Sequence, residues 1–179
     1  MKKIVLLVLV ACYSFAPTQE KKLTKTGTIT FEASVPSFEE VKAKNTAVTC
    51  ILNTTNGEIA ALALMKGFRF KIALMEEHFN ENYIESSKYP KATFKGKIKN
   101  FDVSKVNSTS NDYTINGKLE LHGKSKDITT IAKIKKIGND IEIKTAFSVN
   151  ASDFDIKIPS VVSKKVAKKV DIDCNFLLK

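Results

Sequence analysis

Apolar and polar residues alternate along most of the chain after residue 27. Over residues 170–178 every even position is apolar, whereas the odd positions begin with Asp171, Asp173 and Asn175. A period of two is typical of β-strands that bury one face and leave the other in water. The pattern predicts strands over residues 28–35, 46–54, 58–64, 68–72, 92–99, 113–122, 128–137, 141–149 and 170–178.

Short turn sequences join several of these segments. Asn56-Gly57 suits a two-residue type I′ turn, and Gly138-Asn139-Asp140 offers residues that tolerate a positive φ. Such turns make neighbouring strands antiparallel. Asn116-Gly117 interrupts a continuous strand pattern, so a β-bulge and a turn are both open there.

Residues 73–87 follow a different pattern. Their apolar and aromatic side chains recur near helical spacing, at Leu74, Met75, Phe79 and Tyr83. We expect a short helix here. Tyr89-Pro90 marks its end, because the residue before a proline avoids the α region.

These elements predict an all-β fold, namely an antiparallel barrel of about eight strands with one short helix covering an end. A barrel with its apolar face toward lipid would crowd a small lumen with charged residues such as Lys95, Lys97 and Lys99, so we place the apolar face inside. A barrel of this size either fills its interior with its own side chains or holds one small ligand. Periodicity alone does not separate these two cases.

The chain has 179 residues, the size of one domain, and is 43% hydrophobic and 27% charged, as folded globular proteins are. Two lysines, an apolar run and small residues predict a signal peptide over residues 1–16. Residues 9–12 also fit a lipobox, in which acylated Cys12 would anchor the protein. We expect a periplasmic or secreted protein, with lipoprotein anchoring through Cys12 as the alternative. An N-terminal linker over 17–26 and a barrel domain over 27–179 complete the predicted organisation.

Few residues suit catalysis or metal binding. Cys50 and Cys174 fall on apolar faces of predicted strands, where two small buried side chains are the simpler interpretation and a disulfide is the alternative. The scattered cysteines and histidines lack the spacing of a zinc site, so we expect no metal. His122 precedes Gly123 in a turn, and we expect its role to be structural. No nucleophile elbow, phosphate-binding loop or positioned carboxylate pair is recognisable, so we expect no catalytic residues and no enzyme activity.

The chain is basic, with a formal net charge of +10. Its densest lysine cluster lacks interleaved aromatic residues on which bases could stack, so we expect a solvated face and no nucleic-acid partner. Peripheral contact with an anionic membrane is another use for these lysines, since each contributes roughly 1 kcal/mol near such a surface. The cluster consists of Lys164, Lys165, Lys168 and Lys169.

Three stretches together resemble the YceI-like family. They are EHFNENYIESSKYPKATFKG over residues 77–96, GKLELHGKSK over 117–126 and SDFDI over 152–156. Asp155 stands where the family often has glycine, and the family's aromatic-rich opening has no clear counterpart near residues 27–35. The resemblance implies an extended, lipocalin-like, eight-stranded antiparallel barrel that binds a polyisoprenoid chain in its central cavity and lies in the periplasm or is secreted.

We therefore expect a non-catalytic carrier that holds an isoprenoid or similar apolar lipid, or a quinone-like molecule, and no other cofactor. The alternative is a barrel with a filled core that acts through its outer surface as an interaction or stress-response adaptor module. Sequence leaves the oligomeric state open.

The predicted ligand-binding residues come from the inward positions of the strands and from the helix. His78 matches a histidine that many family members carry; contact with a lipid headgroup is one interpretation, and a partly buried helix histidine bonded to backbone is the one we favour. The predicted lining is Phe68, Phe70, Phe94, Leu119, Leu121, Ile143, Phe147 and Phe176, with Met75, Phe79 and Tyr83 near the entrance.

Overall fold

The structure, a computed structural model, describes residues 20–179. The predictions that concern residues 1–16, a signal peptide and acylation of Cys12, lie outside the described residues.

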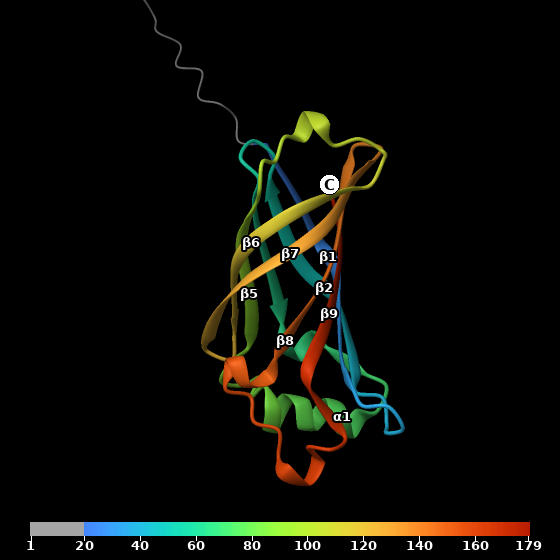
Figure 1. Cartoon of the computed structure of the whole chain (residues 1–179), viewed down its shortest axis with the longest axis vertical. Coiled ribbons are helices and arrows are strands. Elements are labelled where there is room, and N and C mark those ends of the chain that lie inside the picture. Colours follow the sequence, from blue (N-terminus) through green and yellow to red (C-terminus); the bar gives the residue numbers. More distant parts are fainter. Residues whose placement is uncertain (1–19) are drawn as a thin grey trace, which may run out of the picture.

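The described strands form one closed, antiparallel, lipocalin-like barrel (Figure 1). Neighbours around it follow the order β1-β9-β8-β7-β6-β5-β3-β2, and pairing of β1 with β2 closes the ring. The two-residue strand β4 pairs with β2 beyond the end of β3, so the barrel has eight long strands in this part of the chain. The strands are β1 Lys21–Ser34, β2 Lys42–Asn53, β3 Glu58–Leu64, β4 Arg69–Phe70, β5 Lys91–Ile98, β6 Asn111–Leu121, β7 Lys124–Ile137, β8 Asp140–Asn150 and β9 Val166–Leu178.

Two strand predictions need correction. β1 begins at Lys21 and residues 21–24 pair with β2, so residues 21–26 belong to the barrel instead of forming a linker. The predicted strand over 68–72 shrinks to β4 because the chain turns into a helix at Ala73. Phe68 and Phe70 still pack into the core, as their inward positions predicted.

Gly117 lies in neither a bulge nor a turn. β6 runs through it without a register shift, and it pairs with Gly96 on β5 and Ile128 on β7. A side chain at Gly117 would collide with the ring of Phe94, which crosses the two glycines. The Asn-Gly pair here therefore makes room for an aromatic ring.

The predicted turns occur at their glycines, although the turn at Gly57 is not of the predicted type. Gly57 has a φ of +75° and donates its N–H to the carbonyl of Asn53, which closes a four-residue connection in place of a type I′ turn. Gly138 takes a φ of +61° in the tight β7–β8 turn, as predicted. His122 and Gly123 both have positive φ and make the two-residue β6–β7 turn.

Short helices gather at one end of the barrel, which we call the helical end (Figure 1). They are α1 Ala73–His78, the single π-helical turn η2 Phe79–Tyr83, and the 3-10 turns η4 Ala151–Phe154 and η5 Ser160–Val162. α1 and η2 together form the helix that the sequence predicted to cover an end. The opposite end carries the β7–β8 turn, the C-terminus and the turn η3 Val103–Lys105; we call it the filled end. A further turn, η1 Met65–Gly67, joins β3 to β4.

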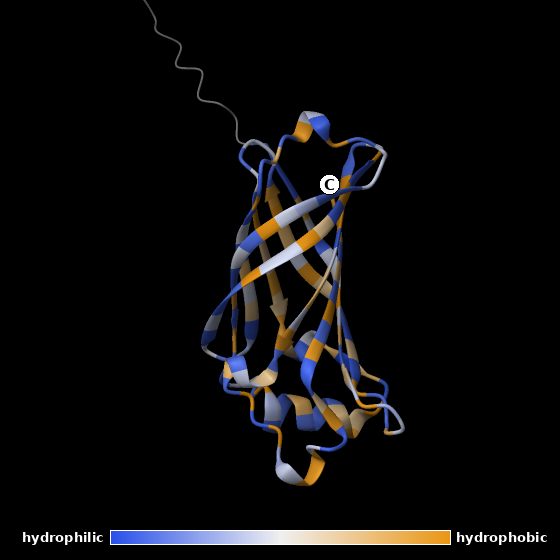
Figure 2. Cartoon of the chain, in the orientation of Figure 1, coloured by the Kyte–Doolittle hydropathy of each residue, from blue (hydrophilic) through white to orange (hydrophobic). Residues whose placement is uncertain are grey.

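Hydrophobic and hydrophilic residues alternate along the strands (Figure 2), and burial follows this alternation. On β8, Ile141, Ile143 and Val149 are buried while Lys144 and Ser148 are exposed. Within residues 20–179 no helix is both long and apolar enough to cross a membrane.

Candidate functional site

The barrel interior is packed toward the filled end. Leu52, Ile98, Ile134, Ile141 and Leu178 have no exposed surface there and touch one another across the lumen. Interdigitated side chains of this kind leave no space for a ligand. Any ligand must therefore enter from the helical end.

Below this packed region the lumen is hollow. A cavity of about 400 Å³ extends from the middle of the barrel to the helical end. Its walls are almost wholly apolar, and aromatic side chains such as Phe31, Phe94 and Phe147 are only partly buried because they border this space. The cavity removes the premise of the adaptor hypothesis, which required a filled core.

The bottom of the cavity is built by residues shared with the packed core. Ile143 and Phe176 are neighbours on β8 and β9, and both are buried while bordering the cavity. Phe176 reaches across to Gly27 on β1, where an added Cβ would lie 2.5 Å from its ring. Glycine at this position lets the ring seal the bottom of the cavity.

Every residue in the predicted lining borders this cavity. Of the predicted residues, Ile143 and Phe176 lie at the bottom of the cavity and Phe68 and Phe70 lie toward its mouth, whereas Met75, His78, Phe79 and Tyr83 border it from α1 and η2. The structure thus brings together residues spread from position 68 to position 176. Their contact with a bound lipid stays a prediction.

Four phenylalanines from three regions of the chain form a cluster beside the mouth. Phe31 of β1 lies with its ring centroid 5.3 Å from Phe68, 5.7 Å from Phe70 and 5.3 Å from Phe79. Tilted and edge-on contacts at these distances are favourable for aromatic rings. The cluster holds η2 against the barrel wall by apolar contact.

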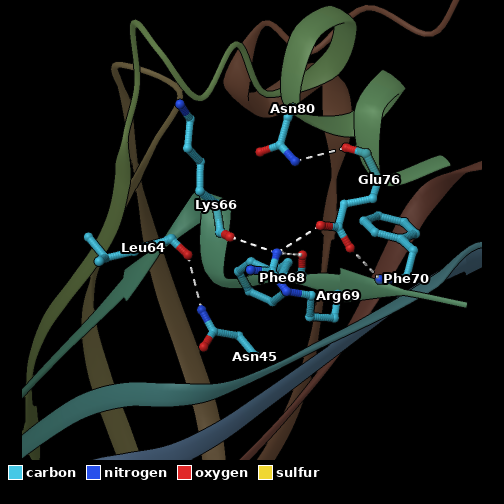
Figure 3. Close-up of polar contacts among 8 residues, drawn as sticks. All are labelled: Asn45, Leu64, Lys66, Phe68, Arg69, Phe70, Glu76 and Asn80. Atoms are coloured by element: carbon cyan, nitrogen blue, oxygen red, sulfur yellow. Dashed lines mark hydrogen bonds and ion pairs between the residues drawn. The ribbon is translucent and has the colours of Figure 1, made fainter. Parts of the chain in front are cut away.

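Polar contacts from one carboxylate fix α1 to the neighbouring strand (Figure 3). Glu76 accepts hydrogen bonds from Arg69 Nη1 at 2.7 Å and from the backbone N–H of Phe70 at 3.1 Å. The Asn80 side chain donates to the Glu76 carbonyl at 2.8 Å. The helix that borders the mouth is therefore held in one place.

His122 organises the helical end from the other side. Its Nδ1 lies 2.8 Å from the Phe154 carbonyl, its Nε2 lies 3.1 Å from Glu85 Oε2, and its ring meets Tyr89 edge-on at 4.3 Å. These contacts join the β6–β7 turn to η4 and to the segment after η2. The structural role predicted for His122 is confirmed.

His78 does not have the environment that we favoured. It is exposed on α1, and within residues 20–179 its ring forms no hydrogen bond. A six-residue helix on the surface offers no second layer of chain to bury this side chain. His78 lies instead on the rim of the cavity, together with Glu39 and Lys165.

The hydroxyls of the cavity wall are already satisfied. Thr130 and Thr145 face the lumen with their Oγ atoms 2.9 Å apart, and the carbonyls of Ala146 and Ile131 also lie within hydrogen-bond distance of Thr130 and Thr145 respectively, so both hydroxyl protons have acceptors within the wall. Because their protons are bound within the wall, these threonines demand no polar partner from a ligand. The deep part of the cavity thus suits the apolar part of a ligand. A polar group of the ligand would find polar side chains only at the rim.

The two cysteines are free and buried. Burial raises the pKa of both thiols to about 12, so neither is ionised near neutral pH. Cys174 borders the cavity as one more apolar side chain. Among the residues described, no group of three or more His, Cys, Asp or Glu side chains is arranged to hold a metal ion.

Several lining residues escaped the prediction. Ile29, Phe31 and Ile172 lie on inward positions of β1 and β9, and the same alternation could have found them. Ile158 and Val162 lie in an irregular segment between η4 and β9, where no periodic signal exists. Only the fold brings that segment across the mouth.

Comparison with known proteins agrees with this architecture. A sequence model of the YceI-like domain matches residues 19–178, whereas no curated protein matches the chain. A polyisoprenoid binding domain from Saccharophagus degradans, implicated in plant cell wall breakdown, aligns at 14% identity with a TM-score of 0.77 over 89% of this chain and 97% of that one. Burkholderia cenocepacia BcnA aligns at 16% identity with a TM-score of 0.69 over 85% and 96% of the respective chains. A Campylobacter jejuni YCEI protein aligns at 16% identity with a TM-score of 0.54 over 100% and 99%.

Proposed function

This chain belongs to the YceI-like family, and from that membership and its cavity we propose that it is a non-catalytic carrier for an apolar, isoprenoid-type lipid. The observation that carries the proposal is the hollow, apolar half of the lumen. Its volume of about 400 Å³ lies within the range of roughly 300–1,000 Å³ typical of small-ligand sites. The Saccharophagus degradans protein of the same fold is a polyisoprenoid binding domain, which supports this ligand class.

The energetics favour a hydrocarbon chain in such a cavity. Burying each five-carbon unit stabilises the complex by about 3–4 kcal/mol, taking about 0.8 kcal/mol per buried carbon group. Two or three units would offset an association cost of about 10 kcal/mol. Affinity then needs no headgroup contact, so the depth of the cavity selects the length of the chain.

The distribution of polar groups sets the orientation of the ligand. An isoprenoid tail, or the tail of a quinone-like molecule, would point toward Phe176, and its polar group would remain near His78 and Lys165 at the rim. We propose that the carrier acts in the periplasm or after secretion. Loading and delivery of such a ligand require peripheral contact with an anionic membrane.

Extraction of the purified protein tests the proposal directly. Organic extraction followed by mass spectrometry should recover an apolar lipid close to one per chain. Recovery of no lipid from protein purified out of cells, together with no uptake of added isoprenoid, would refute the carrier function.

A substitution that fills the cavity makes this test specific. Ala61 of β3 borders the cavity and is paired with Phe94 on β5, so Ala61→Phe places a new ring in empty space. We expect Ala61→Phe to fold, since it fills a void, and to lose at least ten-fold in bound lipid. Ala60→Phe is the matched control, because Ala60 is the next residue on the same strand and lies outside the cavity lining. Equal lipid content in the two variants would place the ligand elsewhere.

A further inference from the structure

The segment that crosses the mouth is strongly basic. Residues 156–169, which we call the strap, run from the end of η4 into the first residues of β9 and contain five lysines but no aspartate or glutamate. Lys157, Lys164, Lys165 and Lys168 are exposed and form no salt bridge within the part of the chain that the structure describes.

The strap has two faces. Ile156, Ile158 and Val162 border the cavity on its inner side. On the outer side Val161 is 87% exposed, more than any other large hydrophobic residue among those described. The strap projects beyond α1 at the tip of the molecule, and this tip carries hydrophobic residues beside hydrophilic ones (Figures 1 and 2).

The strap is tied to the barrel mainly at its two ends. Within the described chain, each hydrogen bond of residues 157–165 is made to another residue of the strap, such as the bond from the Lys165 N–H to the Val162 carbonyl. At one end the Ile156 N–H bonds to the Ala151 carbonyl, and at the other Val166 pairs with Ser34 of β1. The outer side of the strap thus has no hydrogen-bond partner elsewhere in residues 20–179.

We propose that the strap is a docking element that places the mouth of the cavity against an anionic lipid bilayer. This inference rests on the proposed carrier function. An exposed apolar side chain surrounded by lysines is complementary to a bilayer surface, where Val161 enters the acyl boundary and the lysine ammonium groups meet lipid phosphates. A lipid could then pass between membrane and barrel without crossing water.

Charge also sets which side of the helical end faces the membrane. Asp153 and Asp155 of η4 lie next to the strap but pair with Lys126 and Lys124. Of the acidic residues of this end that form no salt bridge within residues 20–179, Glu39 lies in the β1–β2 connection, and Glu77 and Glu81 lie on the helix. An anionic surface repels these groups and attracts the strap. The barrel therefore docks on its strap side, with α1 turned away.

The absence of tryptophan from the chain allows a direct test. Val161→Trp introduces a single indole at the tip of the strap, and Ile137→Trp introduces one at an exposed site near the filled end. On addition of phosphatidylglycerol-containing vesicles with brominated acyl chains, we expect a blue shift and quenching for Val161→Trp alone. An unchanged spectrum for Val161→Trp, or an equal response in the two variants or with neutral phosphatidylcholine vesicles, would overturn the proposal.

Removal of the strap lysines tests the electrostatic part of the proposal in a protein that keeps Val161. The triple variant Lys164→Ser, Lys165→Ser and Lys168→Ser should lose on the order of 100-fold in vesicle sedimentation, at about 1 kcal/mol per lysine. The matched control, Lys95→Ser, Lys97→Ser and Lys99→Ser, removes the same charge from β5 and its end and should retain binding within a few-fold. An equal loss of vesicle binding in the two triple variants would show that the overall net charge, and not the strap, drives binding. All variants carry Cys12→Ser, so acylation cannot account for the binding.

The docking test is independent of cavity occupancy. Ala61→Phe should bind vesicles as the unsubstituted protein does while it carries less lipid. Vesicle binding without any bound lipid would refute the carrier function alone, and lipid content without vesicle binding would refute the docking alone.

Discussion

The two cysteine side chains show how burial by itself decides chemistry at the residue scale. Cys50 lies on β2 in the packed core, and Cys174 lies on β9 beside the cavity. Desolvation is the largest cause of the raised pKa of each thiol. A thiol that stays protonated is a poor nucleophile and behaves as a small apolar side chain.

Both thiols should therefore resist alkylation in the folded protein. With a pKa of about 12 for each, we expect Cys50 and Cys174 to remain unmodified by iodoacetamide at about pH 8 for hours and to react fully in denaturant. Peptide mapping by mass spectrometry measures each site separately. Rapid modification of either cysteine without unfolding would contradict the burial described here.

Asp155 shows how backbone conformation constrains a single position. It has a φ of 57° and ends η4 in the left-handed region, where glycine is the residue without a steric penalty. Aspartate is among the residues that tolerate this region. Its carboxylate also lies 2.9 Å from Lys124 Nζ, which ties η4 to β7 and gives a charged residue a structural role at this position.

At the scale of elements, ion pairs hold η4 to the barrel. Lys126 of β7 binds Asp153, whose side chain also accepts from the Asn150 N–H, and Lys124 of the same strand binds Asp155. These contacts fix the point from which the strap departs. The neighbouring lysines hold the pKa of both carboxyl groups below the usual 3.8.

Because both pKa values are lowered, the contribution of these two carboxylates to the stability of the fold should depend on pH in the acid range. A carboxyl group with a lowered pKa in the folded state stabilises the fold fully above about pH 4, and this contribution is lost as pH falls through the lowered pKa. The double variant Asp153→Asn and Asp155→Asn should thus have a lower urea midpoint than the unsubstituted protein near neutral pH, and the difference should shrink below about pH 4. Urea unfolding followed by circular dichroism measures it. Asp127→Asn removes an exposed ion pair with Lys118 on the barrel flank and serves as the control; a pH-independent difference for the double variant would contradict the assignment.

For the whole molecule, the division of the lumen into a packed half and a hollow half separates stability from binding. The packed half gives the barrel a core that does not depend on a ligand. The hollow half leaves apolar surface uncovered, and a bound chain covers it. A ligand that binds only the folded state adds to stability by mass action.

Removal of the lipid should consequently lower the melting temperature. At a ligand concentration of about 100 times Kd the gain is about 2.7 kcal/mol, which corresponds to roughly 5–10 °C for a domain of this size. Calorimetry before and after delipidation on an apolar resin checks this. Ala61→Phe, which obstructs the cavity and binds less lipid, should show a smaller change, and an equal drop in that variant would indicate damage by the treatment.

The sequence by itself determined the class of fold, the direction of the strands and the side of the wall on which each side chain lies. These properties are local, because successive side chains of a strand point to opposite faces and glycine-containing turns reverse the chain. The same reasoning identified residues that border the cavity, from Phe68 to Phe176. It failed at Gly117, where glycine is needed because the ring of Phe94 on β5 occupies the space of a side chain.

Only the tertiary structure decided how much of the lumen is empty and where it opens. Free volume depends on how side chains from eight strands meet across the barrel, and no pattern along one strand records that meeting. For the same reason the strap had no signal in the periodicity, since its inner residues reach the cavity only because β1 and β9 pair beside the mouth. His78 likewise owes its exposure to the shortness of α1 and the place where Glu76 holds that helix.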